Sequence, residues 1–163
     1  MKLYHASPFI ITQPDIYHSR EHLDFGKGFY LTILREQACQ YAQRFLLRGK
    51  TAYINHYVLD DELSEFNVKK FEHYDEEWLD YVSKCRKGIA LTKYDIVEGG
   101  IANDRVFNTI DLYFAGLIAK EEALGRLAFE YPNHQLCILN QNVINRHLHF
   151  SDVEKITVVQ KGK

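Results

Sequence analysis

The chain lacks the patterns that mark membrane, secreted and disulfide-rich proteins. Its longest apolar runs are a few residues, far below the roughly 20 that a membrane-spanning helix needs. Residues 1–5 contain no apolar stretch of signal-peptide length. The cysteines, Cys39, Cys85 and Cys137, are scattered without Cys-x-x-Cys spacing. They are predicted to be reduced core residues of a cytoplasmic protein.

A strong charge of one sign is also missing. Lys and Arg number 20 against 22 Asp and Glu, which gives a formal net charge of −2. This balance creates no field that favours nucleic acid or an anionic membrane as a partner. The sequence contains no linker, repeat or low-complexity segment, so we expect one domain over residues 1–163.

What the chain does have is apolar content. Hydrophobic residues make up 46% of the sequence and aromatic residues 13%, enough for a sizeable core. Strands and helices are expected in mixed order without repeated strand–helix–strand units, which favours an α+β fold. The expected strands cover residues 2–7, 29–32, 52–59, 94–97, 135–139 and 155–159. The expected helices cover residues 34–48, a segment around 78–85, 104–114 and 120–129.

Local signals refine these segments. Gly49 is expected to end the first helix in a left-handed conformation, and Asp104 is expected to cap the third. Residues 8–28 form a long irregular connection, and loops of that length in compact domains are often functional. The residues expected to share one face of the first helix are Leu34, Ala38, Tyr41 and Phe45.

The most informative stretch is residues 24–32, Asp-Phe-Gly-Lys-Gly-Phe-Tyr-Leu-Thr, where a Gly-Lys-Gly turn precedes an aromatic strand. Glycine permits positive φ and close backbone approach, which a loop beside a flat ligand needs. The dinucleotide and phosphate-loop fingerprints do not fit, because the third glycine position falls at Leu31 and no Gly-Lys-Ser/Thr follows. A turn that only reverses the chain is the structural alternative.

His5 lies in the first expected strand and shares a face with Leu3, whereas Tyr4 and Ala6 point to the other side. A lone histidine on a strand is usually a core residue with satisfied hydrogen bonds. On the wall of a cleft, however, a neutral imidazole would offer a nitrogen to a sugar hydroxyl. The residues alone leave both interpretations open.

Patterns for metal or nucleophilic chemistry are weak. His18 and His22 lie in the long loop, and His147 and His149 alternate along an expected strand. Neither pair has a third ligand, so no metal site is predicted. Cys137 sits in an apolar alternating strand, which favours packing over reactivity. The acidic or histidine clusters that a nuclease needs are also missing from the sequence.

Two motifs resemble those of ADP-ribosyltransferases of the His-Tyr-Glu type, which include diphtheria-like toxins and poly(ADP-ribose) polymerases. They are Tyr-His-Ala-Ser at residues 4–7 and Phe-Gly-Lys-Gly-Phe-Tyr at residues 25–30. In the polymerases one tyrosine packs against nicotinamide and a second, eleven residues later, covers the opposite ring face. This chain has Tyr30 and, eleven residues on, Tyr41. The resemblance implies a split β-sandwich of two small mixed sheets with flanking helices.

From Leu3 to about Leu139 the chain also resembles the bacterial family of domain of unknown function 3990. The similar blocks are residues 23–32, residues 94–97 with residues 103–104, and residues 133–135. Members resemble ADP-ribosyltransferase toxins and are often encoded beside a small antitoxin. The resemblance thus implies an NAD-dependent mono-ADP-ribosyltransferase toxin, with a macromolecular acceptor and an antitoxin as partners.

The resemblance assigns His5, Tyr30 and Gln135 to catalysis. His5 would hold a ribose hydroxyl, the Ala6 backbone would hold the nicotinamide carboxamide, and Arg20 would meet the pyrophosphate. The two tyrosines would cover the two faces of nicotinamide, and Gln135 would hold the 2′-hydroxyl of the adjoining ribose. The residues implied to bind NAD are His5, Ala6, Ser7, Arg20, Gly28, Tyr30 and Tyr41.

Three departures from the family pattern limit this chemistry. Ala6 replaces a glycine, and Ala38 replaces a serine that would reach the nicotinamide amide. Gln135 replaces a glutamate, and an amide cannot take a hydroxyl proton or offset the charge of an oxocarbenium ion. Asp104 could supply the missing carboxylate, and Asn133 could orient the acceptor. Polymer elongation is therefore not expected, whereas single transfer, NAD hydrolysis, or binding of NAD or ADP-ribose without turnover stays open.

Overall fold

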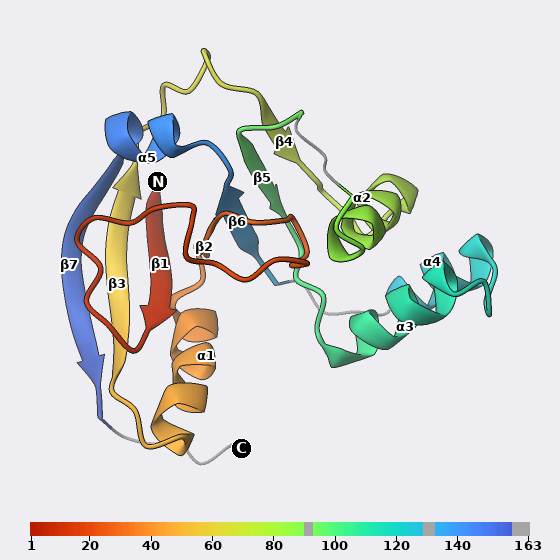
Figure 1. Ribbon diagram of the computed structural model, residues 1–163, viewed down its shortest axis with the longest axis horizontal. Helices are drawn as coiled ribbons and strands as arrows, with labels where there is room; N and C mark the ends of the chain where they lie inside the picture. Colours follow the sequence, from red (N-terminus) through yellow and green to blue (C-terminus); the bar gives the residue numbers. More distant parts are fainter. Residues whose placement is uncertain (90–92, 129–132, 158–163) are drawn as a thin grey trace.

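The computed structural model describes residues 1–89, 93–128 and 133–157. Within these ranges the chain forms seven strands and five helices in mixed order, the α+β arrangement that the sequence predicted (Figure 1). The strands are β1 (Lys2–Ser7), β2 (Phe29–Leu31), β3 (Ala52–Leu59), β4 (Val68–Lys70), β5 (Ile96–Gly99), β6 (Gln135–Ile138) and β7 (Leu148–Ile156). The helices are α1 (Arg35–Leu47), α2 (Glu76–Arg86), α3 (Asp104–Phe114), α4 (Lys120–Leu127) and α5 (Gln141–His147).

The strands form two small sheets. One sheet has the order β1-β3-β7, and it is antiparallel throughout rather than mixed. The other has the order β2-β6-β5-β4 and is mixed, because β4 runs parallel to β5. An antiparallel bridge between Tyr4 and Thr32 joins β1 to β2, so the two sheets meet along these strands.

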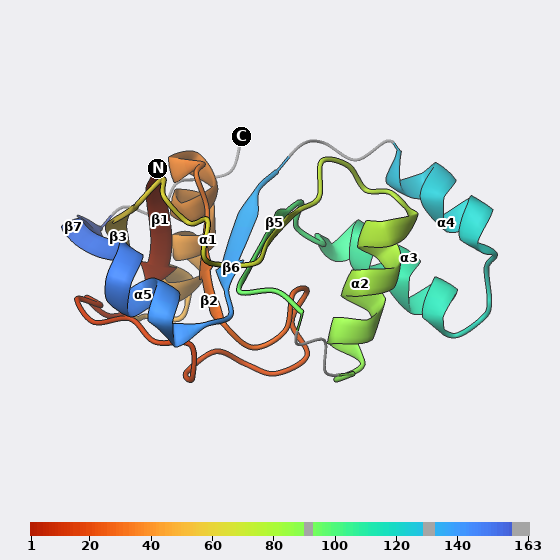
Figure 2. The same ribbon diagram turned by 90° about the horizontal axis from the view of Figure 1, so that it is seen from above.

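Figure 2 shows α2, α3 and α4 on the side of β5 that faces away from β6. Three apolar clusters hold the layers of the fold together. The first lies between α1 and the three-stranded sheet, the second between the two sheets and α5, and the third between the four-stranded sheet and α2, α3 and α4. Strand β2 contributes to two of them, because successive side chains of a strand point to opposite faces. Phe29 and Leu31 pack into the cluster between the sheets, whereas Tyr30 packs against the cluster under the helices.

Helix ends follow the local sequence. Gly49 and Gly88 adopt φ of +71° and +76° just after α1 and α2, as left-handed helix ends require. The predicted cap of α3 at Asp104 is wrong by one residue. Asn103 is the cap, since its side-chain oxygen accepts the N–H of Val106 at 2.9 Å.

The buried face of α1 also differs from the prediction. Ala38, Cys39 and Ala42 are its buried residues, and they let the helix lie close to β1 and β3. Leu34 and Tyr41, which were expected on the same face as Ala38, are 40% and 49% exposed. The small side chains therefore decide which face packs, and Tyr41 stands on the flank of the helix.

Several segments were missed or displaced. Strand β4 and helix α5 were not predicted, and β5 begins at Ile96. The last strand begins at Leu148 instead of Lys155, so it contains His149 of the strand expected around His147 and His149, whereas His147 is the last residue of α5. Predicted helix residue 129 and strand residues 158–159 lie outside the described ranges. In the part of the chain that the structure describes, no helix is both long and apolar enough to cross a membrane.

Candidate functional site

His5 is tied to the strand that carries Tyr30. Its Nδ1 lies 2.6 Å from the backbone oxygen of Tyr30, and its ring lies 4.5 Å from that of Phe29. A carbonyl oxygen only accepts hydrogen bonds, so Nδ1 carries the hydrogen and the neutral ring presents Nε2 as an acceptor. Burial lowers the pKa of His5 below 6.5, which favours this neutral form.

The hydroxyl of Tyr30 turns back to the Gly-Lys-Gly turn. It donates to the backbone oxygen of Gly26 and accepts the N–H of Phe25 at 3.1 Å. Burial raises the pKa of this phenol, so the hydroxyl keeps its proton and the turn keeps this bond. Gly28 approaches β6 so closely that a Cβ there would lie 2.5 Å from the backbone oxygen of Ile138.

Strand β1 directs part of its backbone toward β2. The N–H and C=O of Tyr4 bond the backbone of Thr32 at 2.9 and 3.0 Å. Backbone groups of alternate residues in an antiparallel strand point to the same side. The N–H and C=O of Ala6 therefore face the same edge, while its side chain packs toward α1.

Gln135 lies on the same face of the sheet as Tyr30. Tyr30 pairs with Cys137 across β2 and β6, and Gln135 is two residues before Cys137. The side chain of Gln135 is 8% exposed, and its Nε2 donates to Asp24 at 2.9 Å and to the backbone oxygen of Gly100 at 3.2 Å. The structure thus ties His5 to the backbone of β2 and places Tyr30 and Gln135 on one sheet face, whereas the ring of His5 packs on Phe29, whose side chain points to the other face.

Other predicted site residues make local contacts. Tyr41 packs edge-on against Phe45 and beneath the guanidinium of Arg44, both on its own helix. Ser7 is buried, and its hydroxyl accepts the N–H of Phe9 at 3.1 Å. Arg20 is exposed in the long loop. Within the described residues, no hydrogen bond, ion pair or ring contact joins any of these three side chains to Tyr30 or Gln135.

Asn133 and Asp104 have structural roles. The side-chain oxygen of Asn133 accepts the N–H of Ile101 at 2.6 Å and the hydroxyl of Tyr74 at 2.9 Å, which fixes the start of β6. Asp104 is exposed at the first position of α3. It is Asp24, not Asp104, that places a carboxylate beside Gln135.

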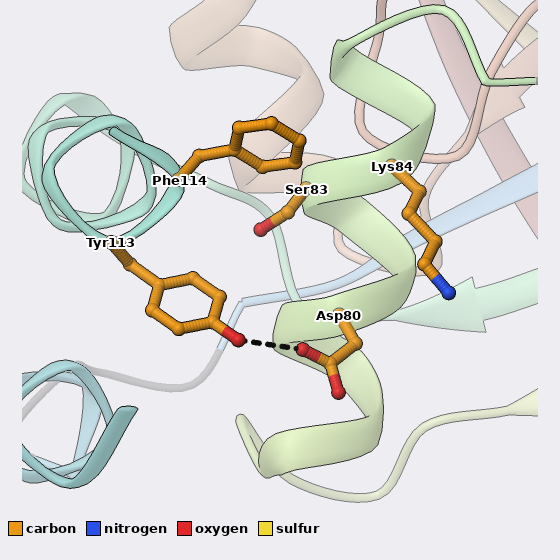
Figure 3. A pocket seen from close by; sticks show the side chains of 5 residues that line it. All are labelled: Asp80, Ser83, Lys84, Tyr113 and Phe114. Carbon is orange, nitrogen blue, oxygen red and sulfur yellow. Dashed lines mark hydrogen bonds between the residues drawn. The ribbon is translucent and has the colours of Figure 1, made fainter. Parts of the chain in front are cut away.

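A cavity of about 300 Å³ lies between α2 and α3 (Figure 3). Across it, the hydroxyl of Tyr113 donates to Asp80 at 3.0 Å. The lining residues are Asp80, Ser83, Lys84, Tyr113 and Phe114. None of them belongs to the predicted NAD site, so this cavity is a separate feature.

Reactive cysteine and metal sites find no support in the described residues. Cys39, Cys85 and Cys137 are free and buried, as predicted. Burial raises the pKa of the Cys137 thiol, which keeps it protonated and a poor nucleophile. Over residues 1–89, 93–128 and 133–157, no group of three or more His, Cys, Asp or Glu side chains is arranged to hold a metal ion.

Two polar contacts beside the site were not predicted. Asp24 is 7% exposed and bonds Arg86, which reaches it from the last turn of α2 and also lies over the ring of Phe107. His134 bonds Glu98 at 2.7 Å. Asp24 and Arg86 are 62 residues apart, so no local spacing in the sequence could have paired them.

Comparison with known proteins shows which family the chain belongs to. A family model described as "Protein of unknown function (DUF3990)" matches residues 1–150. The chain belongs to the DUF3990 family. The predicted membership, which rested on residues 3–139, is therefore confirmed. The ADP-ribosyltransferase activity of this DUF3990 protein stays a prediction. No curated protein and no solved structure matches the chain.

Proposed function

We propose that this DUF3990 protein is an NAD-dependent mono-ADP-ribosyltransferase that acts as the toxin of a bacterial toxin–antitoxin pair. The placement of three residues, distant in the sequence, at or beside β2 is the observation that carries the proposal. His5 bonds the backbone of Tyr30, and Gln135 shares a sheet face with the Tyr30 ring. These are the residues that the His-Tyr-Glu resemblance assigns to catalysis.

The reaction breaks the bond between nicotinamide and C1′ of the ribose. The bonding electrons leave with nicotinamide, which departs as a neutral molecule, and positive charge develops on the ribose. A nucleophile of the acceptor then bonds C1′ and releases its proton. The protein mainly has to position NAD and shelter the transition state.

These roles are the ones that the resemblance implies, and the free acceptor of His5 and the backbone edge at Ala6 support two of them. Nε2 of His5 accepts a ribose hydroxyl, and the backbone of Ala6 at the edge of β1 bonds the carboxamide of nicotinamide. The ring of Tyr30 covers one face of nicotinamide, and Tyr41 covers the other. Gln135 meets the 2′-hydroxyl, and Arg20 meets the pyrophosphate.

NAD hydrolysis, or binding of NAD or ADP-ribose without turnover, is the second candidate. The neutral amide of Gln135 favours it, because an amide cannot offset the charge that develops on the ribose. An acceptor macromolecule is needed by the first candidate only. Co-purification with the neighbouring gene product would test the antitoxin.

Incubation of the purified chain with a cell lysate and NAD labelled in its adenosine half separates these functions. Label on macromolecules supports transfer, free labelled ADP-ribose supports hydrolysis, and retained NAD without nicotinamide release supports a binding module. Failure to bind either NAD or ADP-ribose would overturn both candidates.

Variants of Tyr30 assign the site. Tyr30→Ala is expected to lower nicotinamide release at least about 100-fold, because it removes the ring that positions the leaving group. Tyr30→Phe keeps the ring and removes the bonds to the turn at Phe25 and Gly26, so it should lose less. Tyr17→Ala is the control, since that ring is 63% exposed in the loop. Unchanged release by Tyr30→Ala with an intact fold would remove Tyr30 from the site.

A further inference from the structure

The side chain of Asp24 accepts hydrogen bonds from three donors next to the proposed sugar site. Its Oδ2 accepts the N–H of Ala102 at 3.0 Å and Nε2 of Gln135 at 2.9 Å. Its Oδ1 accepts Nη1 of Arg86 at 3.0 Å. Three donors converge on one buried carboxylate, so Asp24 can serve Gln135 only as a hydrogen-bond acceptor.

This arrangement fixes the orientation of the Gln135 amide. Nε2 has two hydrogens, and its two partners, the Asp24 carboxylate and the backbone oxygen of Gly100, can only accept. The flipped amide would place its oxygen against two other oxygens. Both hydrogens of Nε2 are therefore used in these two bonds. The side-chain oxygen Oε1 receives no hydrogen bond from the described residues.

We propose that Asp24 is a positioning residue of the NAD site, which holds the Gln135 amide so that Oε1 alone is presented to the hydroxyl of the nicotinamide ribose. This inference rests on the proposed function. In this position Oε1 replaces one oxygen of the glutamate expected there, and it accepts the same hydroxyl hydrogen. The charge of Asp24 is paired with Arg86, so Asp24 orients Gln135 and does not itself touch the substrate.

The contact between Asp24 and Gln135 predicts the effect of restoring, at position 135, the glutamate of the His-Tyr-Glu pattern. Gln135→Glu would bring a second carboxylate within about 3 Å of Asp24, and two carboxylates at that distance cannot both stay ionised. The substitution is then expected to weaken the site. If Gln135 were only a degenerate catalytic acid, the same substitution would restore activity.

The test compares Gln135→Glu, Asp24→Asn and the double variant in the full chain. We expect Gln135→Glu to release nicotinamide at least tenfold more slowly than the wild type at pH 8. In the double variant, Asp24→Asn should recover most of that loss, because the amide introduced at position 24 can donate a hydrogen bond to the carboxylate introduced at position 135. Thermal unfolding of the wild type and the three variants without NAD should likewise show that the effects of the two substitutions are not additive. Additive effects of the two substitutions in an active protein would overturn the positioning role.

The pH profile of Gln135→Glu is a second measurement that does not depend on the folding of Asp24→Asn. A protonated glutamic acid donates its hydrogen to Asp24 and presents its carbonyl oxygen, as glutamine does. Nicotinamide release by Gln135→Glu should therefore approach the wild-type rate as the pH is lowered. A gap that widens on acidification would contradict the proposal, whereas a wild type that neither binds NAD nor releases nicotinamide would overturn the proposed function.

Discussion

His134 and Glu98 share a hydrogen bond of 2.7 Å whose proton has one possible position. Nδ1 of His134 accepts the N–H of Ile33 at 3.1 Å, so the neutral ring carries its hydrogen on Nε2 and donates it to Glu98. Both side chains are 12% exposed. The bond to His134 lowers the pKa of the Glu98 carboxyl below 4.5. It connects the start of β6 to β5 at the end of the sheet where the proposed site lies.

Glu98→Ala should lower the free energy of unfolding by about 1–3 kcal/mol near neutral pH, because the ring N–H of His134 loses its acceptor. Since the pKa of Glu98 is lower in the folded state, its contribution is present above 4.5 and is lost as the pH falls through the folded value. Urea unfolding of both proteins between about pH 3 and pH 7 measures the difference. Glu98→Gln keeps an acceptor and serves as the control. A difference that stays constant in acid would contradict this assignment.

His5 and His147 should titrate on opposite sides of 6.5. Burial lowers the pKa of His5, so its contribution to stability is present above 6.5 and is lost as the pH falls toward the folded value. Bonds to Glu65 and Asp60 raise the pKa of His147, so its contribution is present below 6.5 and is lost as the pH rises through the folded value. NMR titration of the ring protons tests both at once. Equal midpoints for the two rings would show that these contacts do not form in solution.

Gly28→Ala should destabilise the fold more than Gly26→Ala. A Cβ at Gly28 would lie 2.5 Å from a backbone oxygen and 2.6 Å from the Cys137 sulfur, so β2 and β6 would have to separate, at about 3 kcal/mol. Gly26 has φ of +87° but nothing within 4 Å of an added Cβ, so alanine costs about 1 kcal/mol of backbone strain. Denaturant midpoints rank the two variants. The reverse order would place the strain in the turn instead of the strand contact.

Ser83→Ala should leave stability unchanged or raise it by up to about 1 kcal/mol. The Ser83 hydroxyl is buried and has no hydrogen-bond partner among the described residues, so its removal loses no bond and places a better helix former in α2. Ser7→Ala is the matched control, because it leaves the N–H of Phe9 without its partner and should cost about 1 kcal/mol. Thermal unfolding distinguishes them. A clear loss in Ser83→Ala would indicate an ordered water on that hydroxyl.

Features set by nearby residues could be predicted from the sequence. Strands β1 and β3 follow from short-range alternation, and the ends of α1 and α2 follow from Gly49 and Gly88. Strand β4 was missed because its three residues are polar or exposed at the edge of a sheet, and the strand with which it pairs, β5, lies further along the chain. Helix α5 is a short polar segment with little periodicity.

The candidate site also has a part that could be predicted from the sequence and a part that could not. The identities of His5, Tyr30 and Gln135 came from motifs, and the structure places them around one strand. The contact between Gln135 and Asp24 could not be predicted from motifs, because Asp24 lies 111 residues away and only the folded chain brings the two together. Contacts of this kind are decided by tertiary packing, which no spacing rule describes.

Strand β6 lies between β2 and β5, although it is made long after both. Domains generally fold as units, and β2 and β5 are joined only through β6 in the described sheet, so this sheet cannot be completed before residues 135–138 have been translated. A chain that ends before residue 135 is therefore expected to lack the face on which Tyr30 and Gln135 lie, and with it the proposed site.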